Sequence, residues 1–157
     1  MAVTLPPFQS LLDAHARDLH RFLVAAAGSH DGDDLFQETV ISALRSYPGL
    51  RHADNLRGWL FTIAHRKIID QARARVRQAV PAADPPEVSH LDVDVLVDAE
   101  LWDAVRRLPP KQRSAVVQRY VLDRPYAEIA AVIGSSEDAA RQNVRAGLQR
   151  LRQEVAP

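Results

Sequence analysis

The sequence predicts an all-α protein made of two small helical domains. Apolar residues recur at steps of three and four through most of the chain, which is the period of an amphipathic helix. No stretch shows the alternation of a strand, and neither a glycine-rich phosphate loop nor a long repeat is present. The acidic, proline-rich stretch 81–94 lacks any period, so it predicts a linker between a first domain, 1–80, and a second, 95–157.

The first helix is expected from Phe8 to Ala26, directly after two prolines. The stretch from Gly28 to Gly32 is expected to break the helical pattern. A second helix should then begin at Asp33-Asp34 and end at Pro48-Gly49. Asp34, with Gln37 three residues later, has the character of a capping box.

This second helix is expected to present two different faces. Its apolar side is predicted to hold Leu35, Phe36, Val40, Ala43, Leu44 and Tyr47. Its polar side is predicted to hold Asp34, Gln37, Glu38 and Ser42. A polar side of this kind is either a solvated surface or a docking surface, and the pattern alone leaves both open.

A long third helix is expected from Leu56 to Gln78, after a loop that covers Leu50 to Asn55. Asn55 is a suitable N-cap. The C-terminal half of this helix carries five basic side chains between Arg66 and Arg77. Basic residues suit a helix C-terminus through the helix dipole, but five exceed that need and favour contact with a polyanion.

After the linker, helices are expected from Leu96 to Leu108 and from Lys111 to Leu122. Pro109-Pro110 separates them, and Pro110 suits the first position of the later helix. Leu101, Trp102, Val105 and Leu108 of the earlier helix are expected to face inward. The later helix carries Val116, Val117, Tyr120 and Val121 as its apolar positions, which favour the core.

The stretch from Pro125 to Arg152 predicts a helix-turn-helix. A short helix over Tyr126 to Ile133 is followed by Gly134, where a helix end favours a residue that tolerates positive φ. Ser135 or Ser136 can cap the second helix. The apolar stripe of that helix is predicted to be Ala140, Val144, Leu148 and Leu151. Its polar faces suit the major groove of DNA, although an ordinary helical hairpin with a solvated face would show the same pattern.

The distribution of charge favours a nucleic-acid partner, although the net charge is zero. The stretch 63–80 carries five basic residues and one acidic residue, whereas 81–104 carries seven acidic residues and no Lys or Arg. From residue 105 onward there are ten basic and five acidic residues. Two basic blocks therefore flank an acidic one, and clustering matters more than the total for a polyanion partner.

Composition and residue spacing argue against several other function classes. The chain has no cysteine, which excludes disulfides and thiolate metal sites and fits a reducing cytoplasm. No signal peptide and no apolar run long enough to cross a bilayer is apparent, so membrane insertion is not expected. The histidines are scattered, and helix capping explains Asp33 and Asp34, which together with Glu38 could be imagined as a metal site. We therefore expect no enzyme activity, no cofactor and no metal.

Two segments resemble the same family in the same order. Asp33 to Arg77 resembles the second conserved region of bacterial extracytoplasmic-function (ECF) sigma factors, and Leu101 to Arg152 resembles their fourth region. The sharpest marks are Asp34-Leu35 with Gln37-Glu38-Thr39, Trp59-Leu60, Ile63-Ala64, Asp70, Leu108-Pro109-Pro110 with Arg113, and Glu128-Ile129-Ala130 with Gly134. Each mark is weak alone, but jointly and in this order they are specific.

The resemblance implies a sigma factor that binds RNA polymerase core and directs initiation at promoters with −10 and −35 elements. The helix from Asp33 to Ala43 would dock on the clamp helices of the largest polymerase subunit, through Asp34, Gln37 and Glu38. The residues implied at the −10 element are His52, Asp54, Asn55, Arg66, Lys67, Arg73 and Arg77. Those implied at the −35 element are Ser136, Glu137, Arg141, Gln142 and Arg145. An anti-sigma factor is a further candidate partner, and the two domains are expected to be weakly coupled by a flexible linker.

The chain also departs from the family pattern. Arg66 stands where Asn is common, and Ala139-Ala140 where Thr-Val is common. Asn143 and Ala146 replace two common arginines, and Gly147 replaces an alanine at about 1 kcal/mol of helix propensity. Two other hypotheses therefore stay open: a one-component helix-turn-helix regulator, and a sigma-like adaptor that no longer initiates transcription.

Overall fold

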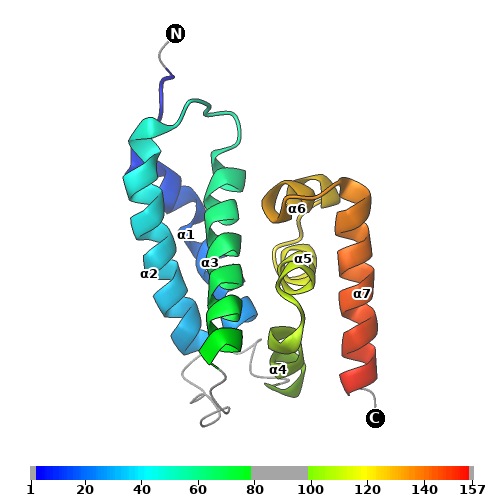
Figure 1. The fold of residues 1–157 in the computed structure, drawn as a ribbon. Coiled ribbons are helices and arrows are strands. Elements are labelled where there is room, and N and C mark those ends of the chain that lie inside the picture. Colours follow the sequence, from blue (N-terminus) through cyan, green and yellow to red (C-terminus); the bar gives the residue numbers. More distant parts are fainter. Residues whose placement is uncertain (1–2, 79–98, 156–157) are drawn as a thin grey trace.

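The computed structural model describes residues 3–78 and 99–155, and within these ranges every regular element is helical. The predicted all-α class is confirmed. Figure 1 shows three long helices, α1 to α3, beside a second group, α4 to α7. The predicted linker, 81–94, lies outside the described residues, and the division into domains 1–80 and 95–157 stays a prediction.

Helices α1 (Phe8–Ala27) and α2 (Ser29–Ser46) meet at a single glycine. Gly28 has a φ of 90°, a left-handed conformation that an L side chain rarely adopts, and it alone turns the chain. The prediction that α2 begins at Asp33-Asp34 is therefore wrong. Asp34 lies in the second turn, so it cannot cap the helix, and Asp33 pairs instead with His20 of α1 at 2.6 Å.

Gly32 allows the backbones of α1 and α2 to lie close together. It is buried, and a Cβ atom at this position would lie 2.7 Å from the Cα atom of Val24. Only a residue without a side chain permits two helix backbones to cross so closely. The glycine that the sequence pattern assigned to a break is therefore inside a helix, where it serves packing.

Helix α3 (Leu56–Gln78) follows a short 3-10 turn, η1 (Tyr47–Gly49), and a loop. Its predicted cap is confirmed, because the Asn55 Oδ1 atom accepts a hydrogen bond from the Gly58 backbone N–H at 3.0 Å. The aromatic rings of Tyr47 and Trp59 lie with centroids 6.0 Å apart and hold the start of α3 near the end of α2.

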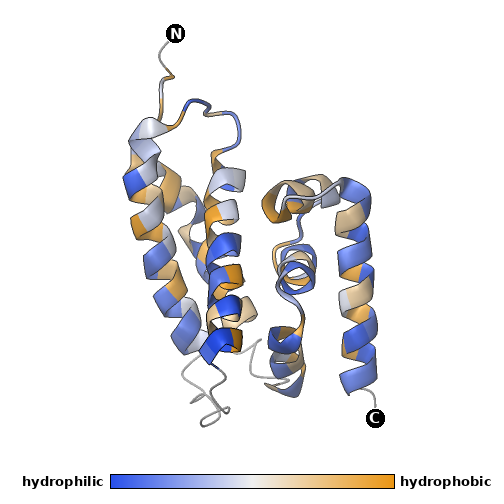
Figure 2. Cartoon of the chain, viewed as in Figure 1, coloured by the Kyte–Doolittle hydropathy of each residue, from blue (hydrophilic) through white to orange (hydrophobic). Residues whose placement is uncertain are grey.

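The second group consists of α4 (Ala99–Arg107), α5 (Pro110–Tyr120), α6 (Tyr126–Ile133) and α7 (Glu137–Val155). Gly134 has a φ of 69°, as the helix-turn-helix prediction requires. Figure 2 shows α6 as largely hydrophobic and α7 as largely hydrophilic with apolar bands. The predicted stripe on α7 is confirmed, since Ala140, Val144 and Leu151 are buried and Leu148 is half-buried.

Three expectations about burial and packing are wrong. Leu44 on α2 is 54% exposed and Tyr120 on α5 is 61% exposed, although both were expected to face inward. The two helix groups are also more than weakly coupled, because one cluster of buried apolar residues includes members of both. Helix α3 packs on α5 and α6, and α1 packs on α4 and α5. No helix among the described residues is long and apolar enough to span a membrane.

Candidate nucleic-acid interface

The outer face of α2 carries the three residues predicted to dock on a partner. Asp34, Gln37 and Glu38 are all exposed and lie within little more than one helical turn. Ile41 and Leu44, 49% and 54% exposed, extend the same surface toward the helix C-terminus. Large aliphatic side chains are stabilised when a partner removes them from water. A polar patch that is continued by exposed Ile41 and Leu44 therefore fits a protein partner.

The N-terminal turns of α2 also bring together potential metal ligands. His30, Asp31 and Asp34 each place one ligand atom within 4.8 Å of the others. Asp31 already pairs with Arg75 of α3, and the His30 and Asp34 side chains are 83% and 60% exposed. Exposed acidic groups often gather in this way without an ion, so this grouping adds no metal site to the prediction.

The residues predicted for the −10 element fall into two separate groups. His52 and Asp54 are exposed in the loop before α3, where Asn55 is committed to capping. Arg66 lies eleven residues beyond Asn55, which is about 17 Å along a helix axis. The predicted set is therefore a track along α3 and its leading loop, and it forms no single pocket.

A basic stripe runs along the C-terminal half of α3. Arg66, Arg73 and Arg77 are exposed and are spaced by seven and four residues, so they share one face of the helix. Asp70 lies on the same face and leaves the stripe with an excess of two positive charges. Lys67 is half-buried on a different face. Aligned guanidinium groups at this spacing suit the phosphates of a nucleic-acid strand.

Three of the five residues predicted for the −35 element make polar contacts within the protein at the start of α7. They are Ser136, Glu137 and Arg141. Ser136 Oγ accepts a hydrogen bond from the Ala139 backbone N–H at 3.1 Å, so this serine is the cap. Arg141 pairs with Glu137 at 2.6 Å and with Asp138 at 3.2 Å. The Arg141 guanidinium also lies 5.1 Å from the centre of the Tyr126 ring. These contacts hold Arg141 against the start of its own helix.

Gln142 and Arg145 are the two residues predicted for the −35 element whose side chains make no polar contact within the described part of the chain. Both are exposed, and neither has a hydrogen-bond or ion-pair partner among the described residues. A shallow hollow lies beside them, where the family's usual arginines are absent. It is lined by Asp138, Ala139, Gln142, Asn143 and Ala146. The amide nitrogen of Asn143 is occupied, because it donates to the Ala139 carbonyl at 2.9 Å.

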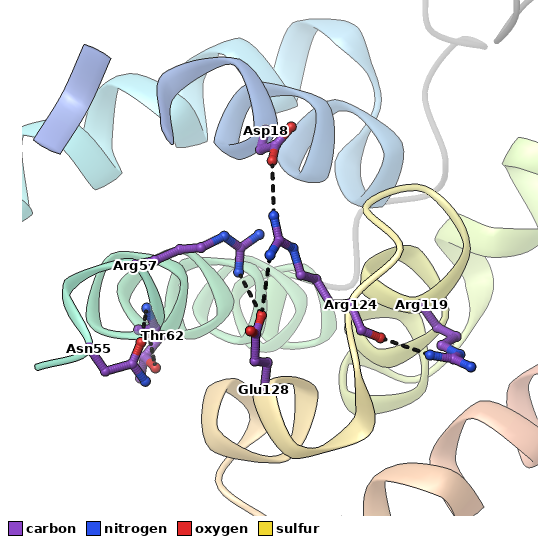
Figure 3. A network of polar contacts seen from close by, with 8 residues as sticks. Asp18, Asn55, Arg57, Thr62, Arg119, Arg124 and Glu128 are labelled. Atoms are coloured by element: carbon purple, nitrogen blue, oxygen red, sulfur yellow. Dashed lines mark hydrogen bonds and ion pairs between the residues drawn. The ribbon is translucent and has the colours of Figure 1, made fainter. Parts of the chain in front are cut away.

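Sequence reasoning missed the polar contacts that join the two helix groups. Figure 3 shows Arg124, which precedes α6, between Asp18 of α1 and Glu128 of α6, each at 3.5 Å. Arg57 of α3 reaches Glu128 at 3.7 Å and lies 4.0 Å from the centre of the Phe61 ring. Burial, and then the charge of Arg124, lowers the pKa of Arg57. Arg124 and Glu128 are four residues apart, but no local pattern signals the Arg124–Asp18 and Arg57–Glu128 pairs, because their members come from different helix groups.

Two further buried groups contribute to the same interface. His65 of α3 and Ser114 of α5 are both buried, with the Nδ1 and Oγ atoms 2.6 Å apart. Arg113 of α5 donates to the Leu108 carbonyl of its own group and to the Ala26 carbonyl of α1 at 3.2 Å. Burial lowers the pKa of Arg113 to about 10. Arg113 was a mark of the family resemblance, but its contact with α1 was not foreseen.

Comparisons with known proteins match both helix groups. A model of sigma-70 region 2 matches residues 11–78, and a model of sigma-70 region 4 matches residues 98–151. The ECF RNA polymerase sigma factor SigE of Mycolicibacterium smegmatis is 33% identical over 97% of the chain and 63% of its own length. The RNA polymerase sigma factor CarQ of Myxococcus xanthus is 31% identical over 93% of the chain and 87% of its own length.

Coverage of the curated relatives varies. The chain spans 63% of SigE and 50% of the sigma factor SigG of Mycobacterium tuberculosis, so it is shorter than several proteins that it resembles. Among solved structures, the sigma factor RpoE of Bartonella quintana in complex with the anti-sigma factor NepR has a TM-score of 0.73 at 23% identity, covering 98% of this chain and all of that one. CnrH, in complex with the cytosolic domain of CnrY, has a TM-score of 0.63 at 19% identity, covering 93% of this chain and 85% of that one. At these identities the likeness shows the fold alone.

Proposed function

Because the chain belongs to the ECF sigma factors of the sigma-70 family, we propose that it binds RNA polymerase core and directs promoter-specific transcription initiation. The observation that carries the proposal is that one chain bears three exposed surfaces of different chemistry. These are the acidic and aliphatic face of α2, the basic stripe of α3, and the uncommitted polar residues of α7. Each surface suits one of the contacts that a sigma factor needs.

The α2 face is the proposed contact with the clamp helices of the largest polymerase subunit. Asp34, Gln37 and Glu38 offer acceptors and a donor for orientation. Ile41 and Leu44 offer apolar area, which contributes about 25 cal/mol for each Å² removed from water. Their exposure is the feature that distinguishes this face from an ordinary solvated one.

The basic stripe of α3 and the loop before it are proposed to hold the −10 element. Arg66, Arg73 and Arg77 would contact phosphates, which positions the strand and gives no sequence preference by itself. The exposed loop residues His52 and Asp54, at the other end of the track, are the candidates for contacts with bases. A strand laid along α3 would meet both groups.

The helix α7 is proposed to read the −35 element. Residues without a polar partner inside the protein are the stronger candidates for contacts with bases. Gln142 can pair the adenine edge and Arg145 the guanine edge in the major groove, and both are free to do so. Arg141 would first have to leave Glu137 and Asp138. Exposed ion pairs of this kind contribute little to stability, so breaking them costs little free energy. The need to break them still makes Arg141 a weaker candidate for DNA contact than Gln142 or Arg145.

The direct test is run-off transcription by core polymerase with this protein on a library of promoter fragments. Specific transcripts that require the protein support the proposal. Core binding without transcription would favour a sigma-like adaptor, and DNA binding without any core affinity would favour a one-component regulator. The proposal places the protein in the cytoplasm with the polymerase. Because RpoE is seen in complex with the anti-sigma factor NepR, an anti-sigma factor is a proposed partner.

Replacing Gln142 or Arg145 by alanine is expected to cost about 1–3 kcal/mol of promoter binding and to relax the preference at one −35 position. The measurement is selection from a randomised −35 element with the reconstituted holoenzyme. Arg152→Ala is the matched control, since Arg152 is exposed near the far end of the same helix. It is expected to preserve the consensus. An unchanged consensus in Gln142→Ala and Arg145→Ala would place sequence reading on other residues.

A further inference from the structure

One buried polar pair joins α3 to α5. The His65 ring is 3% exposed, and its Nδ1 atom lies 2.6 Å from the Ser114 Oγ atom. On its other side, the Nε2 atom has no hydrogen-bond partner within the described part of the chain. The ring is thus satisfied at one nitrogen only, and that partner comes from the opposite helix group.

The surroundings of His65 favour a neutral ring. The charges that act on it are Arg66 of α3 and Lys111 of α5, and both are positive. Burial, and then these two cations, lowers the pKa of His65 to about 4. A protonated ring would carry an unpaired, charged N–H in a buried position, which is strongly unfavourable.

The other side-chain contacts between the two helix groups include ion pairs between carboxylates and arginines. Asp18 and Glu128 are carboxylates paired with Arg124, and Glu128 also meets Arg57. His15 lies near the same arginines, and burial, followed by the charge of Arg57, lowers its pKa. Of the charges that lower this pKa, only Arg124 belongs to the other helix group, so a proton on His15 disfavours the packed arrangement to a smaller extent.

We propose that the His65–Ser114 pair is a proton-operated latch, in which a neutral ring holds α5 against α3 and a proton on the ring releases it. If the two helix groups separate, His65 meets water and moves away from Lys111, so its pKa rises back toward the ordinary value of 6.5. The packed arrangement is therefore fully favoured above pH 6.5 and loses that advantage as the pH falls toward 4. Between pH 7.5 and pH 5 the ratio of released to packed chains rises on the order of ten- to thirtyfold.

The latch gains a functional meaning if the chain acts as proposed at two promoter elements. Elements named −10 and −35 are about 25 base pairs apart, which is about 85 Å of duplex at about 3.4 Å per pair. A compact chain of 157 residues has a radius of gyration of about 15 Å. The packed arrangement therefore cannot reach both elements at once, so the two helix groups must separate before one chain contacts both.

Energy transfer between two dyes tests the latch on the free protein, without polymerase or DNA. The chain has no cysteine, so Ser46→Cys on α2 and Gln149→Cys on α7 give two specific labelling sites, both exposed. Transfer is expected to be high at pH 7.5 and to fall as the pH is lowered to 5, which is still above the ordinary pKa values of Asp and Glu. Equal transfer throughout this range would overturn the proposal and leave the sigma-factor proposal untouched.

Variants identify the residue that is responsible. His65→Gln keeps a hydrogen-bonding group but cannot take up a proton, so most of the acid response should disappear. His30→Gln, at an exposed histidine of α2, should retain the full response, and His15→Gln should lose a smaller part. Ser114→Ala should raise the released fraction several-fold at pH 7.5, which tests the pair even if His65→Gln folds poorly. A full acid response in folded His65→Gln, or no effect of Ser114→Ala, would contradict the latch.

Discussion

Replacing Gly32 by alanine is expected to destabilise the protein by about 2–3 kcal/mol. The new Cβ atom would lie 2.7 Å from the Val24 Cα atom and 2.9 Å from the Val24 nitrogen. Both are backbone atoms of α1, so no rotamer change can relieve the contact and the two helices must move apart. The gain in helix propensity, at most about 1 kcal/mol, offsets only part of this cost.

Thermal unfolding followed by circular dichroism measures this effect. For a chain of this size, the loss corresponds to a fall in Tm of roughly 5–10 °C. Gly49→Ala is the matched control, because a Cβ atom at Gly49 meets nothing within 4 Å. That variant is expected to unfold within about 0.5 kcal/mol of the parent. If the two variants were equally stable, Gly32 would not be the point that sets the distance between α1 and α2.

Reversing the charges of Asp34 and Glu38 together, each to lysine, is expected to weaken binding to core polymerase at least tenfold, or about 1.4 kcal/mol. Both side chains are exposed on α2, so the fold has no need of their charge. The loss should be larger at low salt, since exposed charges are screened over about 10 Å at 0.1 M. Fluorescence anisotropy of the singly labelled protein, titrated with core polymerase, measures the affinity.

The control for this experiment must change the net charge equally on another surface. Asp13→Lys with Glu100→Lys does so, because both residues are exposed and belong to α1 and α4, not to α2. This variant is expected to bind core as the parent does, and both double variants should keep the parent's helix content. Equal affinity in the two double variants would remove α2 from the docking assignment. An additional Ile41→Ser change should lower the affinity further, since Ile41 lies on the same face.

Much of the fold followed from local patterns. The spacing of apolar residues predicted the helices, Asn55 was recognised as the cap of α3, and Gly134 was recognised as the turn of the helix-turn-helix. These succeeded because caps and turns depend on a few neighbouring residues. The start of α2 failed because Gly32 was treated as a local break, whereas its role depends on the backbone of α1.

The roles of the candidate contact residues stay predictions, and the structure shows only which of them are exposed. Exposure agrees with prediction for Asp34, Gln37 and Glu38 on α2 and for the basic stripe of α3, because helical spacing fixes which residues share a face. The commitment of Arg141 to Glu137, Asp138 and Tyr126 was not apparent from the sequence. Such contacts depend on where α6 ends relative to α7, which no single helix determines.

The sequence by itself determined the helical class, the order and approximate limits of the helices, and the family, since each depends on local spacing or on ordered motifs. Only the tertiary structure decided that Leu44 is exposed, that Gly32 lies against the backbone of α1, and that His65 meets Ser114. Residues 49 positions apart have no common period or cap. His65 and Ser114 meet only because burial of a shared apolar cluster packs α3 against α5. Polar groups buried between the two helices lose their contacts with water and must hydrogen-bond to each other instead.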